Sequence, residues 1–169
     1  MDNSIGGRKT CLSYVIMIKY KLAPYRSAGR SHEGRVYMKI VVIDGQGGSV
    51  GRMLIERLLK KLPEACIVAV GTNSIATATM LKAGVRLGAT GENATIVNVR
   101  DADYVVGPIG IVIADSLLGE ITPAMAVAVG SSPAKKVLIP SLKCNNYVVG
   151  TRDITLDKLV DLAVEEITN

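Results

Sequence analysis

The chain has 169 residues, 49% of them hydrophobic and 21% charged, which suits one folded domain and excludes a disordered chain. It has no Phe, no Trp and one His, so we expect neither an aromatic platform for single-stranded nucleic acid nor a metal site. The net charge of +5 would suit a polyanionic partner, but residues 1–37 carry all of it. We therefore expect residues 38–169 to bind neither nucleic acid nor a membrane.

Residues 1–37 differ in composition from the rest of the chain. They hold seven Lys and Arg against two acids, and their apolar run over 11–18 is too short to span a bilayer. Met38 directly precedes an expected first strand, and the codons of residues 33–35 can form a ribosome-binding sequence. We interpret 1–37 as an over-extended gene prediction or a disordered tail, with a functional basic tail as the alternative, and 38–169 as one domain.

The cysteines and the apolar runs bear on the compartment. Three Cys at wide spacings form neither a disulfide framework nor a zinc or redox motif. No stretch of 38–169 is long and apolar enough to predict a membrane span. These features predict a cytoplasmic protein.

The domain opens with a strand over 39–44, whose continuous β-branched run is typical of a strand covered on both faces. A glycine-rich loop over 45–51 follows, then an amphipathic helix over 50–62 and a second buried strand over 65–71. This succession predicts a βαβ unit with a right-handed crossover.

The rest of the domain alternates in the same way. The expected elements are a helix over 75–83, a strand or buried helix over 94–99, a strand over 103–108, a helix over 109–121, a helix over 123–129, strands over 135–140 and 147–150, and a last helix from 155 to 167. The alternation predicts a Rossmann-like α/β fold, an open and mostly parallel sheet with helices on both faces. The strand order does not follow from the pattern.

The expected helix over 123–129 has no polar face. Such a helix is buried on every side, either by the sheet and its loops or by a partner subunit. In so small a domain we expect a homo-oligomer, with a monomer as the alternative.

Ligands of such sheets bind beyond the carboxyl ends of the strands. The loop after the first strand matches GxxGxxG, and glycine lets backbone N–H groups approach a phosphate at a helix start. A tight turn is the alternative interpretation. The predicted cofactor-binding residues are Gly45, Gln46, Gly47, Gly48, Ser49 and Gly51 in this loop, Thr72 and Asn73 after the second strand, and Gly107, Pro108 and Gly110 after the 103–108 strand.

Four side chains are candidate catalytic groups: Asp44, Glu92, Glu120 and Cys144. Each has a plain structural alternative, and Cys144 has no His in the domain to serve as its base. A nucleotide, a dinucleotide such as NAD or NADP, or a phosphorylated small molecule is the expected ligand. If the protein is an enzyme, an NAD(P)-dependent oxidoreductase is the leading hypothesis. The alternative is a non-catalytic, oligomeric ligand-binding module, because the acid that usually follows the second strand of NAD-binding folds is missing.

Several motifs resemble one bacterial family. They are MKIVVIDGQGG (38–48), GTN (71–73), MLKAG (80–84), GATGENA (88–94), VGPIGIVIA (106–114), LGEITPAMA (118–126), KKVLIP (135–140) and KCN (143–145). Together they are similar to domain-of-unknown-function family 3842, over essentially all of 38–169. The resemblance implies a Rossmann-like cytoplasmic protein and supplies no activity. It also implies that Ser49 stands where family members usually carry a third consecutive Gly.

Overall fold

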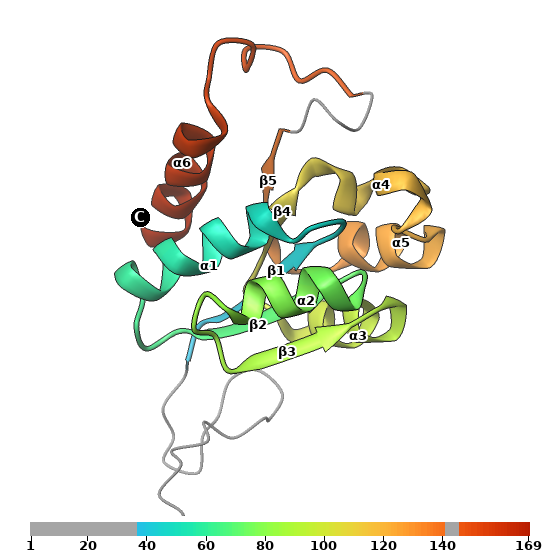
Figure 1. Cartoon of the computed structure of the whole chain (residues 1–169), viewed down its shortest axis with the longest axis horizontal. Helices are drawn as coiled ribbons and strands as arrows, with labels where there is room; N and C mark the ends of the chain where they lie inside the picture. The colour runs from blue at the N-terminus through green and yellow to red at the C-terminus, as the bar shows by residue number, and fades with distance from the viewer. Residues whose placement is uncertain (1–36, 141–145) are drawn as a thin grey trace, which may run out of the picture.

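The computed structural model describes residues 37–140 and 146–169, which fold as one parallel sheet between two layers of helices (Figure 1). The Rossmann-like α/β class predicted from the sequence is confirmed. The interpretation of residues 1–37 lies almost wholly outside the described residues and stays a prediction. The candidate nucleophile Cys144 also lies outside them.

The sheet has five strands in the order β3-β2-β1-β4-β5, and every neighbouring pair is parallel. The strands are β1 (Lys39–Asp44), β2 (Cys66–Gly71), β3 (Leu87–Thr90), β4 (Tyr104–Pro108) and β5 (Lys135–Ile139). The chain proceeds outward from β1 through β2 to β3, then returns to the other side of β1. The strand order therefore reverses between β1 and β4, which is where sheets of this class open a crevice for ligands.

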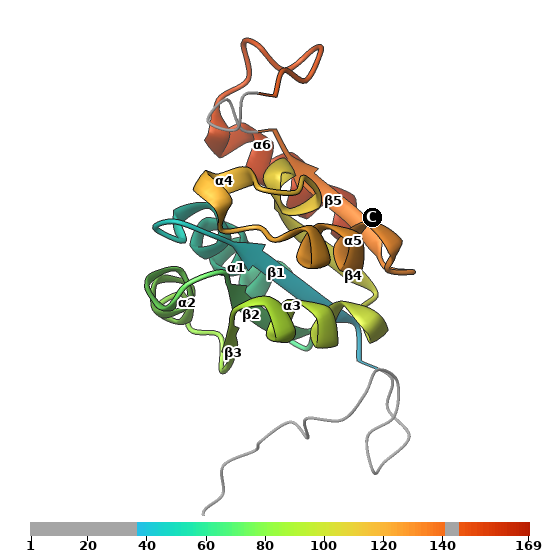
Figure 2. The same ribbon diagram turned by 90° about the vertical axis from the view of Figure 1, so that its right-hand side faces the viewer.

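Helices cover both faces of the sheet. They are α1 (Ser49–Lys61), α2 (Ser74–Leu81), α3 (Glu92–Asn98), α4 (Ser116–Gly119), α5 (Pro123–Ser131) and α6 (Leu156–Thr168), with 3-10 turns η1 (Val99–Asp101) and η2 (Ile109–Val112). The helices α1, α2 and α6 pack on one face. The helices α3 and α5 lie side by side on the other face, as the second view shows (Figure 2).

The pleat of β1 explains why its sequence is apolar at every position. Ile40 and Val42 point into the core under α1 and α6, whereas Val41 and Ile43 point into the core under α3 and α5. All four side chains are fully buried. Each contributes about 1.5–3 kcal/mol of burial, so the central strand holds the switch-point edge in a fixed position.

Side chains cap the starts of three helices. Asn73 accepts from Ala76 N, Thr122 from Met125 N and Thr155 from Lys158 N. In addition, Arg57 of α1 donates to the side chains of Asp157 and Asp161. These bonds attach α6 to α1 and fix the segment that leads into α6.

For residues 94–99, which belong to α3 and η1, the helical alternative is confirmed, but other expected elements are wrong. The short strand β3 was not expected. Residues 109–121 do not form one helix, because the backbone leaves the helical region after η2. Residues 147–150 form no strand, since none of the five described strands includes them.

The prediction that 123–129 is buried on every side is met on one side only within the described residues of a single chain. The helix α5 buries Met125, Ala126 and Val129 against the sheet, but Val127 on its outer side is 67% exposed. The reason is that a helix packed on one face of a sheet needs only one buried side. The sheet and its loops therefore cover the inner side of α5. That a partner subunit covers the outer side remains a proposal.

Candidate functional site

Asp44, the last residue of β1, is turned into the start of α1. Its side chain is 5% exposed, with Oδ1 accepting from Gly45 N at 2.8 Å and Oδ2 from Gly51 N at 2.7 Å. Burial raises the pKa of Asp44; hydrogen bonds from the backbone N–H groups of Gly51, Gly45 and Val50 oppose this, and nearby Glu120 adds to it. The carboxylate therefore supplies, from within the chain, the negative charge that a helix start favours.

The glycines of the loop after β1 divide into packed and open positions. Gly48 has φ +68°, and a Cβ there would lie 2.5 Å from Ala76 O. A Cβ on Gly51 would lie 2.4 Å from Met80 Sδ. Around Gly47, by contrast, an added Cβ would meet nothing within 4 Å. Gly48 and Gly51 are thus required by the turn and by helix packing, and only Gly47 leaves room for a ligand.

The residues after β4 also differ in role. A Cβ on Gly107 would lie 2.2 Å from Ile43 O of the neighbouring strand, so this glycine permits the strands to approach. Pro108 lines the cavity described below. Gly110 is buried in η2, where its carbonyl accepts from Ser116 Oγ at 2.6 Å. Of the predicted site residues Gly107, Pro108 and Gly110, only Pro108 lines the cavity.

Thr72 and Asn73, which were predicted to bind a cofactor, both donate to Glu120. The Oε2 atom of Glu120 accepts from Gln46 N at 2.8 Å, from Asn73 Nδ2 at 3.0 Å and from the Thr72 hydroxyl. Burial acts to raise the pKa of Glu120, but the hydrogen bonds from Thr72, Gln46 and Asn73 outweigh it and lower the pKa below its usual value. We call these three donors the Gln46–Thr72–Asn73 cluster.

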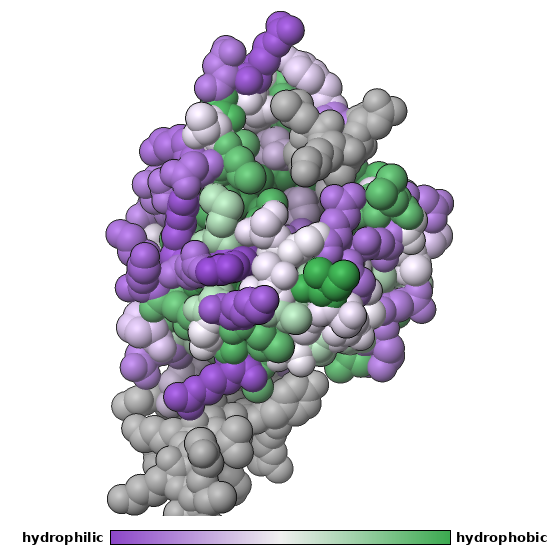
Figure 3. Space-filling model, viewed as in Figure 1, coloured by the Kyte–Doolittle hydropathy of each residue, from purple (hydrophilic) through white to green (hydrophobic). Residues whose placement is uncertain are grey.

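The segment that carries Glu120 has an unusual backbone. Asp115, Leu117, Leu118 and Gly119 all have positive φ, between 54° and 86°. For residues other than glycine this conformation costs about 1–2 kcal/mol each. Leu117 is buried against the core, but Leu118 is 93% exposed. In the space-filling view, green apolar surface marks α4 and the start of α2, where Ile75 is 68% exposed (Figure 3). Backbone strain such as the positive φ values of the α4 segment is found most often at functional loops.

A cavity of about 420 Å³ opens at the switch point between β1 and β4. The glycine loop forms one side of it, through Gly45–Gly47 and Ser49, and Asp44 lies at its base. Its apolar walls come from the strand ends and from the segment before α6; they are Val50, Pro108, Leu117, Ile139, Pro140, Val148, Ile154, Leu156 and Leu159. Arg152 adds a cation to the lining, and Asn146 and Thr151 add polar groups.

The sequence of this fold has a counterpart among known families. The profile of the family described as "Domain of unknown function (DUF3842)" matches residues 39–169. The chain belongs to this family. The match confirms the resemblance that the motifs predicted, and it runs from the first strand of the DUF3842 domain to its last helix.

Comparisons outside the family add little. No curated protein matches the chain. Among solved structures, the DUF3842 chain is similar to a dodecameric FMN-dependent UbiX-like decarboxylase from Escherichia coli O157:H7. The identity is 17% and the TM-score 0.39, with 77% of this chain and 91% of that chain covered. We draw no functional argument from so distant a likeness.

The structure places the candidate Glu92 away from the cavity. Glu92 is exposed at the start of α3 and accepts from the Thr122 hydroxyl. Among the described parts of the DUF3842 chain, no group of His, Cys, Asp and Glu side chains could hold a metal ion. Within the same ranges, no helix combines the length and the hydropathy that crossing a membrane requires.

Arg152 and Leu117 also line the cavity, and neither was among the predicted site residues. Neither follows a strand directly: Leu117 lies in the strained α4 segment, and Arg152 in the irregular stretch before α6. The isolated Arg in an otherwise apolar and acidic stretch was the only available signal.

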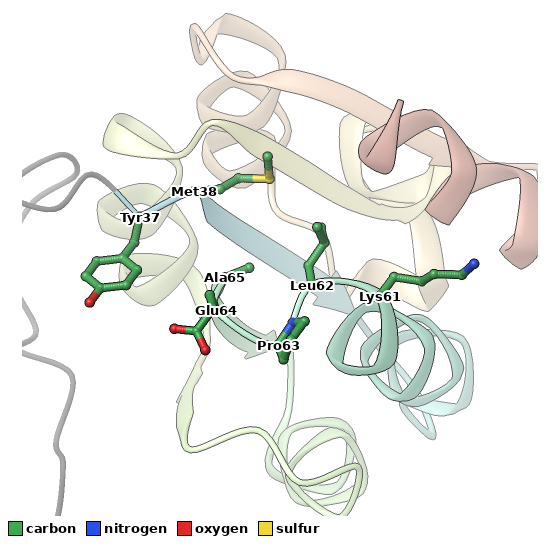
Figure 4. A pocket seen from close by; sticks show the side chains of 7 residues that line it. All are labelled: Tyr37, Met38, Lys61, Leu62, Pro63, Glu64 and Ala65. Carbon is green, nitrogen blue, oxygen red and sulfur yellow. The ribbon is translucent and has the colours of Figure 1, made fainter.

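A second hollow, of about 450 Å³, lies at the opposite edge of the sheet. It is formed by Tyr37, Met38 and the α1–β2 connection over 61–65, and the side chains of Tyr37 and Lys61 point away from each other (Figure 4). Parallel sheets of this class bind ligands at the carboxyl ends of their strands, whereas this hollow is at the amino ends. We therefore assign the candidate site to the switch-point cavity.

Proposed function

We propose that the protein binds a small phosphorylated ligand of mononucleotide size in the switch-point cavity. The observation that carries this proposal is the meeting of an open glycine loop and a cation across one cavity. Gly47 and Ser49 offer N–H groups that donate to no other described residue. Arg152 lines the same space and forms no ion pair with the residues of 37–140 or 146–169.

The charges favour one anionic group at the mouth of the cavity. Because Asp44 already holds the N–H groups of Gly45 and Gly51, a phosphate has to bind farther out, at Gly47, Ser49 and Arg152. A guanidinium beside backbone donors suits a phosphate, since it can donate two parallel hydrogen bonds. The apolar walls then cover the uncharged part of the ligand.

The size of the cavity and the state of the β2 edge favour a mononucleotide over a dinucleotide. A volume of about 420 Å³ lies at the small end of ligand sites, which span about 300–1,000 Å³. A dinucleotide would cross the switch point toward the end of β2. At the end of β2 stand Thr72 and Asn73, and no Asp or Glu follows the strand to bind the ribose hydroxyls of NAD, so the site gives NAD no specific support.

The geometry supports binding more than catalysis. Asp44 is engaged by the backbone of the first turn of α1, and Glu92 lies outside the cavity. The proposal is therefore closer to the non-catalytic ligand-binding module than to the oxidoreductase. A homo-oligomer that covers the outer side of α5 is part of the same proposal, because Val127 there is apolar and exposed.

Thermal shift of the full chain against AMP, FMN, ATP, NAD, NADP and S-adenosylmethionine tests the ligand. A mononucleotide at about a hundred times its Kd should stabilise the protein by about 2.7 kcal/mol. Arg152→Gln should abolish the shift, and the matched control Arg100→Gln should retain it, because Arg100 is exposed in η1 before β4. No shift with any compound, or equal shifts in the two variants, would contradict the proposal.

A further inference from the structure

The Gln46–Thr72–Asn73 cluster directs three hydrogen-bond donors at a single oxygen atom. The three donors are an amide N–H from the loop after β1, a hydroxyl from the end of β2 and a side-chain amide at the start of α2. The orientation of the Asn73 amide is fixed, because its Oδ1 accepts from Ala76 N at 2.8 Å. Nδ2 therefore has to face Glu120. Convergence of charge-compatible donors is the arrangement that proteins use for carboxylates and phosphates.

Thr72 and Asn73 are held between the end of β2 and the start of α2, and Gln46, with φ +51°, lies in the loop after β1. The acceptor is held by a strained segment of its own. Thr72 N donates to Asp44 O at 3.0 Å, and Asn73 Nδ2 also donates to Gln46 O at 3.1 Å, so the two strand ends fix one another. Glu120 directly follows α4, in which Leu117 and Leu118 both have positive φ. Thr72 and Asn73 are fixed by these hydrogen bonds, whereas Glu120 lies on a strained segment. The two donors therefore keep their positions if that segment moves Glu120 away.

The cluster lies directly behind the wall of the switch-point cavity. The position of a Cβ on Gly45 would be 2.8 Å from Glu120 Oε2, 2.8 Å from Thr72 Oγ1 and 2.9 Å from Leu117 Cδ1. Gly45 and Leu117 both line the cavity. Leu117 and Glu120 belong to the same short segment, so one displacement of it removes a cavity wall and uncovers the three donors.

We propose that the Gln46–Thr72–Asn73 cluster is an oxyanion-binding subsite, and that Glu120 is an internal substitute for a phosphate or carboxylate of the ligand. The subsite rests on the proposed function, since it would take a second oxyanion of the ligand whose first phosphate lies at Gly47 and Arg152. A ligand oxyanion can bind there only after Glu120 has left the three donors. The affinity for the ligand therefore depends on how readily the α4 segment is displaced.

Removal of the internal carboxylate tests the subsite with simple anions. Inorganic phosphate and acetate are titrated into the full chain by calorimetry, for the wild type, Glu120→Ala and the matched control Glu92→Ala, whose carboxylate lies on α3. Glu120→Ala should bind one of the two anions at least about tenfold more tightly than the wild type, because three donors are released. Glu92→Ala should bind like the wild type.

Two further variants make the outcome decisive. In Glu120→Ala/Thr72→Val the gain should be largely lost, since one donor is removed. If Glu120→Ala does not fold, Glu120→Gln replaces it and should still show a gain, because the repulsive charge is gone. No gain for either anion in a folded variant, or a gain that survives Thr72→Val, overturns the proposal.

The test separates this inference from the proposed function. A gain of anion binding without any mononucleotide binding would leave the subsite standing and refute the mononucleotide. If Arg152→Gln loses mononucleotide binding and Glu120→Ala gains no anion binding, the proposed function stands and the subsite is refuted.

Discussion

Gly107 and Gly47 were both predicted as cofactor-binding glycines, and the structure separates them. On Gly107 of β4, an added Cβ would lie 2.2 Å from Ile43 O of β1 and 3.2 Å from Ile111 Cδ1. Real Cβ atoms do not approach within 3.0 Å, so Gly107→Ala has to move two paired strands by about 0.8 Å. On Gly47 the same atom would meet nothing within 4 Å.

The expected stabilities follow from that difference. Overpacking against a strand backbone costs about 3 kcal/mol, so Gly107→Ala should lower the midpoint of thermal unfolding by roughly 10 °C. Gly47→Ala should be neutral or stabilise by up to about 1 kcal/mol, because it restricts the unfolded chain at a position without positive φ.

Chemical and thermal unfolding followed by circular dichroism measure both variants under the same conditions. If Gly107→Ala unfolds within about 0.5 kcal/mol of the wild type, the close approach of β4 to β1 is wrong. If Gly47→Ala is destabilised by more than about 1 kcal/mol, the loop does not leave that position open, and the cavity loses one of its sides.

Three more outcomes are expected. Because burial raises the pKa of Asp44 above 3.8, the folded state holds its proton longer than the unfolded chain, and stability falls as pH rises from 3.8 through the folded value. In urea unfolding across that range, the free energy of unfolding of Asp44→Asn should lack this fall. If the wild type instead gained stability relative to Asp44→Asn as the pH rises, the burial argument would be refuted. Leu118→Asn should stabilise a monomer by up to about 1 kcal/mol in thermal unfolding, because Asn tolerates positive φ and the leucine is exposed; destabilisation would instead indicate a partner on α4. Arg57→Gln should cost about 1–2 kcal/mol in urea unfolding, because the part-buried guanidinium loses Asp157 and Asp161, whereas an unchanged midpoint would show that α6 does not depend on this contact.

The strands were predictable where burial acts on both faces. A continuous β-branched run such as 39–44 has few other structures available, and its predicted and observed bounds agree. The strand β3 was missed because it has four residues, two of them exposed, and a half-exposed edge strand carries no apolar run. The stretch 109–121 looks helical by composition, yet Leu117 and Leu118 adopt a left-handed backbone that no periodicity signals.

The edge of the sheet where several candidate residues meet was predictable, but their contacts were not. The rule of strand ends brought Asp44, the glycine loop, Thr72 and Asn73 together correctly, because parallel strands share one carboxyl edge. That Glu120 would return to Thr72 and Asn73 depends on a turn of the chain distant in sequence. The role of Arg152 depends in the same way on how the segment before α6 folds over the sheet.

The two outer strands limit how copies of this chain can associate. The strand β3 spans only Leu87–Thr90, and β5 starts with Lys135 and Lys136, of which Lys135 pairs with Glu166 of α6. Short edges and edge lysines discourage another chain from continuing the hydrogen-bonded ladder. Assembly into fibres or continuous sheets is therefore disfavoured at both ends. Association of copies is then left to side chains outside the sheet edges. On the helices, the most exposed apolar ones in the described ranges are Leu118 of α4, Ile75 of α2 and Val127 of α5.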